Sequence, residues 1–254
     1  MTFRLSSSGN ESIARPSSND ESDSFTVDSK GMAAYERQGH TDAIKYFREG
    51  VEKGSSYSAY YLGQIYFYGK GVAVDYSEAA KWFSFGAEKN SPWCQMALGY
   101  LYRKGLGVSK DPAKAFSFYK LVSKRNWATV QLYMAEMYAN GEGIKKNLSK
   151  GFKWYRKAAL QGNQMAEYNL GVCYYNSLGV RRDFNEAFKW LKMAAEGGCV
   201  NAQNIVGYMC EHGEGTTEDL SNAVQWYRKA ADQGNENARA SLKRLTEKGI
   251  LVDG

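Results

Sequence analysis

The chain has 254 residues, of which 43% are hydrophobic and 24% are charged, and its formal net charge is +6. The chain is only mildly basic and falls short of the dense positive charge expected of a dedicated nucleic-acid-binding protein. This argues against nucleic acid as the partner. The four cysteines form no Cys-x-x-Cys pair and are too few for a disulfide scaffold in a chain of this length.

The sequence contains no apolar run long enough to form a membrane-spanning helix. Its N-terminal segment has no apolar core of the kind found in secretory signals. We therefore expect a cytoplasmic protein, or a periplasmic or secreted one if a signal peptide has been removed.

Residues 1–28 are rich in Ser, Asn, Asp and Glu and poor in large apolar side chains. So little apolar surface does not offset the entropy lost on ordering, and we predict a disordered tail. From residue 29 the pattern becomes helical. Residues 29–54 contain two short helical segments joined by a turn at 38–40. We predict that this segment is a degenerate first repeat that caps the N-terminal end of the array.

Residues 55–234 repeat with a constant period of 36 residues. An apolar anchor recurs at Leu62, Leu98, Met134, Leu170, Val206 and Leu242, and a paired aromatic residue recurs at Trp82, Phe118, Trp154, Trp190 and Trp226. A constant period in this range indicates stacked repeats, because one unit cannot bury its own apolar face. We predict five full repeats over 55–234, followed by a C-terminal capping helix and tail over 235–254.

Each repeat is predicted to form two antiparallel helices. In the first repeat, Leu62 anchors the first helix, and Gly63 beside it lets the second helix approach closely. Gly69 suits the left-handed conformation at the end of the first helix. Asp75 caps the second helix, and Glu78 three residues later completes a capping box. A glycine or asparagine ends each second helix, at Asn90, Asn126, Gly162, Gly198 and Gly234.

The shared pattern is L-G-x-x-Y-x-x-G-x-G-V-x-x-D-x-x-x-A-x-x-W-[FY]-x-x-[AG]-A. Over roughly residues 29–245 the chain resembles the Sel-1-like repeat family, a variant of the tetratricopeptide-like helical repeats. The resemblance implies an all-α fold, a right-handed α/α superhelix or solenoid of 36-residue helical hairpins, that binds other proteins. Local departures are Gly151 for a helix alanine, Ser177 for a loop glycine, Cys210 for a helix tyrosine and Asn147 for a capping aspartate.

No set of residues in the sequence forms a recognisable active site. Each Gly-x-Gly motif ends a helix, whereas a phosphate-binding loop needs a preceding strand. His212 lies between Glu211 and Glu214 and could hold a weakly bound divalent ion, although a solvated loop is the favoured interpretation. Cys94 takes a small-residue position of its helix, which favours a reduced, buried thiol. We expect no enzyme activity, no cofactor and no metal.

The face of each first helix that points away from its core should line a concave groove, by analogy with tetratricopeptide-like repeats. Aromatic residues, methionine and arginine on such a face dominate binding hot spots. The predicted partner-binding groove consists of Tyr57, Tyr60, Phe67, Tyr68, Trp93, Met96, Tyr100, Tyr168, Tyr175 and Tyr208. Tyr60, Tyr168 and Tyr175 could instead pack between neighbouring helices, whereas Tyr57, Trp93 and Tyr100 are favoured as functional residues.

The turns between the two helices of a repeat carry a row of basic residues from three repeats. This basic edge consists of Arg103, Lys104, Lys110, Lys145, Lys146, Arg181 and Arg182. It is complementary to an acidic partner segment or an anionic surface, and a merely solvated edge fits equally well.

We therefore expect a non-enzymatic scaffold or adaptor that binds a partner protein or peptide in an aromatic-lined groove. Two narrower bacterial roles stay open, a toxin-neutralising immunity protein and a virulence or signalling regulator. Two alternatives come from other classes. One is a β-lactam or cell-wall-directed enzyme like the secreted cysteine-rich relatives, whose paired cysteines this chain lacks. The other is a nucleic-acid binder that uses the basic edge. The oligomeric state is not predicted.

Overall fold

The computed structural model describes residues 22–249, and within this range the fold is entirely helical. The helices are α1 (Ser22–Glu36), α2 (His40–Glu52), α3 (Ser56–Tyr68), α4 (Tyr76–Glu88), α5 (Pro92–Lys104), α6 (Pro112–Val122), the 3-10 turn η1 (Ser123–Arg125), α7 (Ala128–Asn140), α8 (Leu148–Ala159), α9 (Gln164–Asn176), α10 (Phe184–Glu196), α11 (Val200–His212), α12 (Leu220–Asp232) and α13 (Glu236–Glu247). None of these described helices combines the length and the apolar character needed to cross a membrane.

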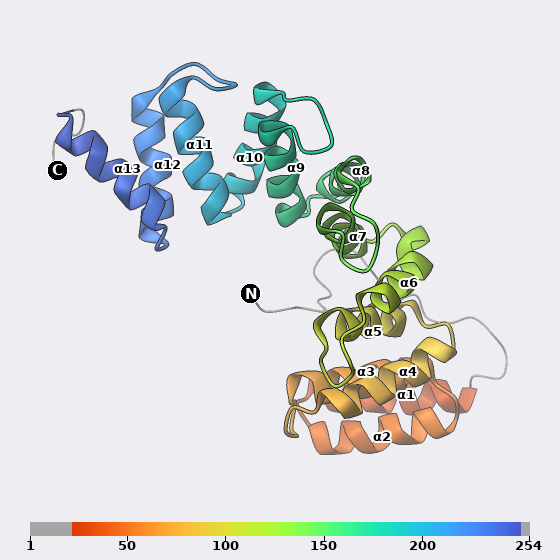
Figure 1. Ribbon diagram of the computed structural model, residues 1–254. Helices are drawn as coiled ribbons and strands as arrows, with labels where there is room; N and C mark the ends of the chain where they lie inside the picture. The colour runs from red at the N-terminus through yellow and green to blue at the C-terminus, as the bar shows by residue number, and fades with distance from the viewer. Residues whose placement is uncertain (1–21, 250–254) are drawn as a thin grey trace. The chain divides into compact units, whose positions relative to one another are not determined.

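The chain divides into two compact units, Met1–Lys124 with α1 to α6 and Arg125–Gly254 with α7 to α13. Within each unit, an odd-numbered helix packs against the even-numbered helix that follows it and forms a hairpin. The next hairpin of the same unit stacks on this one, as Figure 1 shows from α1 to α6 and from α7 to α12. The expected fold class, an all-α solenoid of helical hairpins, is confirmed.

The N-terminal capping hairpin begins earlier than the sequence predicts. α1 starts at Ser22, so residues 22–28 belong to a helix and not to the predicted tail. Val27 is buried, and the carboxylate of Asp28 accepts hydrogen bonds from the hydroxyls of Ser55 and Ser58 in α3 and its cap. These contacts with the next hairpin stabilise a segment whose own composition is too polar to indicate a helix. The remainder of the predicted tail, residues 1–21, lies outside the described residues.

The glycine beside each anchor brings the two helices of a hairpin together, as predicted. A Cβ on Gly63 would lie 2.3 Å from the ring of Phe83 in the opposite helix. The third repeat has Ala135 at this position, and its opposite helix carries Gly151. A Cβ on Gly151 would lie 3.2 Å from the backbone oxygen of Ala135. The missing side chain at Gly151 therefore allows the second helix to approach the backbone of Ala135 closely.

The capping aspartates join the two helices of a hairpin. The carboxylate of Asp75 accepts from the N–H groups of Ser77 at 2.9 Å and Glu78 at 3.0 Å, which confirms the predicted cap. The predicted capping box is wrong, because the N–H of Asp75 donates to the carbonyl oxygen of Tyr66 at 2.9 Å rather than to Glu78. The same backbone hydrogen bond recurs at Asp183. Each cap residue thus satisfies a carbonyl at the end of the first helix and N–H groups at the start of the second.

Candidate functional site

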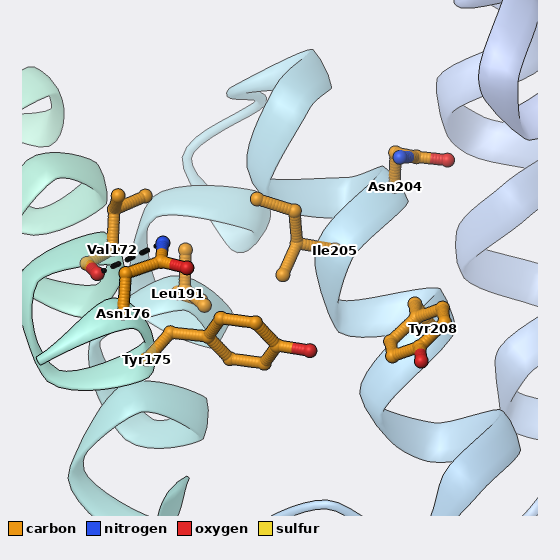
Figure 2. A pocket seen from close by; sticks show the side chains of 7 residues that line it. All are labelled: Val172, Tyr175, Asn176, Leu191, Asn204, Ile205 and Tyr208. Atoms are coloured by element: carbon orange, nitrogen blue, oxygen red, sulfur yellow. Dashed lines mark hydrogen bonds between the residues drawn. The ribbon is translucent and has the colours of Figure 1, made fainter. Parts of the chain in front are cut away.

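The second unit contains a cavity of about 240 Å³ between α9, α10 and α11. Its walls are formed by Val172, Tyr175, Asn176, Leu191, Asn204, Ile205 and Tyr208. Figure 2 shows Val172 of α9 and Ile205 of α11 on opposite sides, with Leu191 of α10 between them. These three side chains give the cavity an apolar floor, and Asn176, Asn204 and the two tyrosines add polar groups to its walls.

Two tyrosines frame the cavity and differ in their surroundings. The Tyr175 hydroxyl donates a hydrogen bond to Oε2 of Glu214 at 2.7 Å, and its ring extends from α9 toward α11 (Figure 2). Burial, together with the Glu214 carboxylate, raises the pKa of Tyr175, so this hydroxyl stays protonated. Tyr208 is 40% exposed, and its ring stacks on His212 with 4.1 Å between centroids. One ring is therefore fixed in place, and the other presents an accessible surface.

Leu191 distinguishes this repeat from the others. The equivalent buried position of the other repeats holds a ring, at Phe83, Tyr119, Tyr155 and Tyr227. Leucine is smaller than these rings, and here it borders the cavity. Helical spacing within one repeat singles out neither Leu191 nor Ile205. The replacement of an aromatic residue by leucine in the aligned repeats is the signal that could have found this cavity.

Three residues of the predicted groove are core residues, so their assignment to an accessible groove is wrong. Tyr60, Phe67 and Met96 are 5%, 8% and 4% exposed. Rings of the following repeat cover two of them, because Trp93 lies 6.0 Å from Tyr60 and Tyr100 lies 6.1 Å from Phe67 between centroids. The sequence pattern shows which side of a helix points away from its own hairpin. It does not show how far the side chains of the next hairpin cover that side.

The other predicted groove residues keep part of their surface accessible. Tyr175 and Tyr208 line the cavity described above. Half-buried rings that pack against the core of their own unit are Tyr57, Tyr68, Trp93, Tyr100 and Tyr168. The trio favoured as functional, Tyr57, Trp93 and Tyr100, thus combines packing with partial exposure, and its role in binding stays a prediction.

The basic edge is mostly exposed, with one exception. Arg103 is only 7% exposed, so its assignment to the basic edge is wrong. It lies in the last turn of α5 on the buried side, and its charge is close to Tyr100, whose pKa it lowers against the larger effect of burial. The exposed members are Lys104 and Lys110 in the first unit and Lys145, Lys146, Arg181 and Arg182 in the second.

The cysteines and the residues around His212 are held in packing or hydrogen-bonding contacts. Burial raises the pKa of the Cys94 thiol to about 12 and that of Cys173 to about 11, so neither is a thiolate nucleophile at neutral pH. The buried, reduced state expected for Cys94 is confirmed. Around His212, the carboxylate of Glu211 accepts from Tyr227 at 2.9 Å and from Arg244 at 2.7 Å. No group of residues that could hold a metal ion was found between residues 22 and 249.

Comparison with protein-family models identifies the repeats. The model of the Sel1 repeat matches residues 56–91, 94–126, 128–163, 164–199 and 200–235. The chain belongs to the Sel1 repeat family. The five matched segments agree with the five repeats predicted from the 36-residue period. Proteins of this family generally serve as non-enzymatic scaffolds for protein–protein interactions.

Two solved structures are similar over most of the chain. The Sel1 repeat protein from Oxalobacter formigenes is 31% identical with a TM-score of 0.76, and the match covers 87% of this chain and 91% of that one. The protein c5321, a protective antigen present in uropathogenic Escherichia coli strains, is 29% identical with a TM-score of 0.81. That match covers 92% of this chain but only 53% of c5321, so the chain spans about half of the length of c5321. No curated protein matches the chain at a significant level.

Proposed function

We propose that this Sel1 repeat protein binds a partner protein by docking one bulky apolar side chain of a peptide segment in the cavity between α9, α10 and α11. The observation that carries the proposal is the apolar floor of Val172, Leu191 and Ile205 beside the accessible ring of Tyr208. Tyrosine is among the residues that dominate binding energies at protein interfaces. The family supports a role in protein binding, and the apolar lining of the cavity supports this location for it.

The size and chemistry of the cavity fit one leucine, methionine or phenylalanine side chain. An apolar cavity of about 150 Å³ holds benzene, and the volume here is about 240 Å³. Binding sites typically combine apolar walls with a few polar groups that fix the orientation of the ligand. Nδ2 of Asn176 donates to the carbonyl oxygen of Val172 at 3.3 Å, which leaves the exposed amide oxygen of Asn176 to accept from a peptide N–H.

Selection of peptides from a displayed random library against the full chain tests this proposal. We expect the selected peptides to share one bulky apolar position, and their Kd is measured by fluorescence anisotropy. Tyr208→Ala should weaken binding by about tenfold or more, as expected for a tyrosine at the centre of an interface. Leu191→Phe should weaken it at least as much, because the new ring occupies the cavity itself.

The matched control is Tyr57→Ala, which truncates a half-buried tyrosine of the first unit. This variant should bind the selected peptides as the wild type does. Peptides that bind Leu191→Phe normally but lose affinity for Tyr57→Ala would contradict the proposal and assign binding to the first unit. Circular dichroism of each variant separates loss of binding from loss of structure.

A further inference from the structure

We propose that the exposed face of α8, together with the loops beside its N-terminus, binds the anionic surface of a phospholipid membrane. This surface is separate from the residues that line the cavity, so the inference does not depend on the proposed function. It rests on an excess of positive charge without ion-pair partners and on an exposed leucine in line with that charge.

Every exposed charged residue of α8 is basic. These residues are Lys150, Lys153, Arg156 and Lys157. Lys150, Lys153 and Lys157 follow the i, i+3, i+7 spacing that places side chains on one helix face. Nζ of Lys150 lies 5.4 Å from the ring centre of Tyr138, and Nζ of Lys157 lies 4.4 Å from that of Trp154. Among the described residues, none of the four basic side chains forms an ion pair with a carboxylate.

The loops around the N-terminus of α8 add further positive charge. The exposed pair Lys145–Lys146 directly precedes the helix. A Cβ on Gly179 would lie 2.3 Å from the backbone carbonyl of Leu148, so the loop between α9 and α10 packs against the first residue of α8. The exposed pair Arg181–Arg182 belongs to this loop. The second-unit part of the basic edge therefore adjoins the charged face of α8.

Helix α10 occupies the same place in the next repeat and lacks this excess. Lys189 pairs with Glu186 and Lys192 pairs with Glu196, each at 3.8 Å, so the charges of α10 are balanced. The difference extends to the helix caps. Asn147 caps α8 by accepting from the N–H of Lys150 at 2.9 Å, whereas α10 is capped by the carboxylate of Asp183.

The basic residues of this face and of the adjacent loops outnumber the acidic residues beside them. Glu142, in the loop before α8, has an interaction with another residue of the chain, and the Asp183 carboxylate accepts from the N–H of Glu186 at 3.0 Å. The repeat fold does not require the excess charge, because α10 forms the same hairpin without it.

A membrane fits this surface better than a nucleic acid or an acidic peptide does. Leu160 directly follows α8, four residues after Arg156, and is 63% exposed. Four to eight basic residues on one helix are typical of binding to anionic lipid headgroups, and an adjacent leucine can enter the interface. The rings of α8 are half-buried at Phe152 and Trp154 and buried at Tyr155, and Lys157 lies over the ring of Trp154, which leaves less ring surface for a nucleic-acid base to stack on. The described cavity, which could seat a peptide side chain, involves α9 to α11 and not α8.

Co-sedimentation of the full chain with vesicles tests the proposal. The vesicles consist of phosphatidylcholine with or without phosphatidylserine. We expect binding only when phosphatidylserine is present, and a decrease with added salt. Each basic residue near an anionic membrane contributes about fivefold in affinity, so Lys150→Gln/Lys153→Gln/Lys157→Gln should lower the partition coefficient by about a hundredfold.

Two further variants separate a specific surface from general positive charge. Lys189→Gln/Lys192→Gln in α10 is the matched control and should change the partition coefficient much less than the α8 variant. Leu160→Ser should weaken vesicle binding without changing its salt dependence. Equal losses for the α8 and α10 variants, or no preference for phosphatidylserine, would overturn the proposal. So would binding to single-stranded RNA or polyglutamate in the absence of vesicle binding.

Discussion

Replacement of Leu191 by phenylalanine should stabilise the second unit, although substitutions of buried residues usually destabilise a protein. Leu191 is fully buried and lines the cavity of about 240 Å³. Gly171 faces it, because a Cβ at this glycine would lie 2.6 Å from Cγ of Leu191. Gly63 makes room for the ring of Phe83 in the same way. The fourth repeat therefore keeps the glycine that accommodates a ring in the first repeat.

The size of the effect follows from the added carbon atoms. Phenylalanine carries about three more carbons than leucine, which at about 0.8 kcal/mol per buried group gives an upper limit of about 2.4 kcal/mol. Because the cavity is open to solvent on one side, we expect about 1–2 kcal/mol, or a rise in Tm of about 2–8 °C. Leu191→Ala should cost about 2–5 kcal/mol instead. Thermal unfolding followed by circular dichroism measures both variants, and a lower Tm for Leu191→Phe would refute the reasoning.

Three further predictions concern the repeat fold. Gly162 and Gly179 both have φ of +75°, but a Cβ would meet nothing within 4 Å at Gly162 and would lie 2.3 Å from the Leu148 carbonyl at Gly179. In urea unfolding, Gly162→Ala should cost about 1–2 kcal/mol and Gly179→Ala clearly more, and equal losses would contradict the packing argument. Trp226 is 7% exposed, so Trp226→Ala should cost about 3–5 kcal/mol, whereas Tyr208→Ala should cost less than about 1 kcal/mol in the same assay. Burial raises the pKa of Glu211, but the hydrogen bonds from Arg244 and Tyr227 outweigh it and lower the pKa overall. Because the folded pKa is below the unfolded value of about 4.3, the stability from Glu211 is present above that pH and is lost as the pH falls through the folded pKa. Glu211→Gln should therefore flatten the acid side of a plot of Tm against pH, and curves of the same shape for both proteins would argue against this role.

The fold is predictable because each repeat needs the same type of residue at the same packing position. One glycine beside Leu62 is weak evidence, but the same residue type beside Leu98, Leu170 and Val206 indicates a close approach of helices. The predicted ends of the first helices are confirmed by glycines with positive φ, and Ser177 adopts the same conformation with φ of 60°. The predicted capping box failed at Glu78 because the N–H of Asp75 has a nearer acceptor, the carbonyl oxygen of Tyr66.

The candidate site was harder to predict because it depends on contacts between repeats. Helical spacing places Tyr175 and Tyr208 on one side of the first helices, and both residues line the cavity. The same spacing predicts that Tyr60 and Phe67 are equally accessible, but Trp93 and Tyr100 cover them. Accessibility at these positions is decided by the sizes of side chains one repeat away. Spacing within a single helix therefore cannot separate the exposed rings from the buried ones.

The departures from the repeat pattern divide into two kinds with different physical consequences. At Gly151 the missing side chain allows a close approach to the backbone of Ala135, so this departure serves the packing of the hairpin. The departures at Leu191 and Asn147 instead change a cavity wall and a charge. Leu191 borders a cavity at a position where other repeats place a ring, and Asn147 removes a negative charge beside a basic helix face. The shared fold does not require either of these residues, because other repeats form the same hairpin with a ring or an aspartate at the equivalent position. Most other positions of the array have the same structural role in every repeat. Leu191 and Asn147 are therefore the positions at which binding should be tested first.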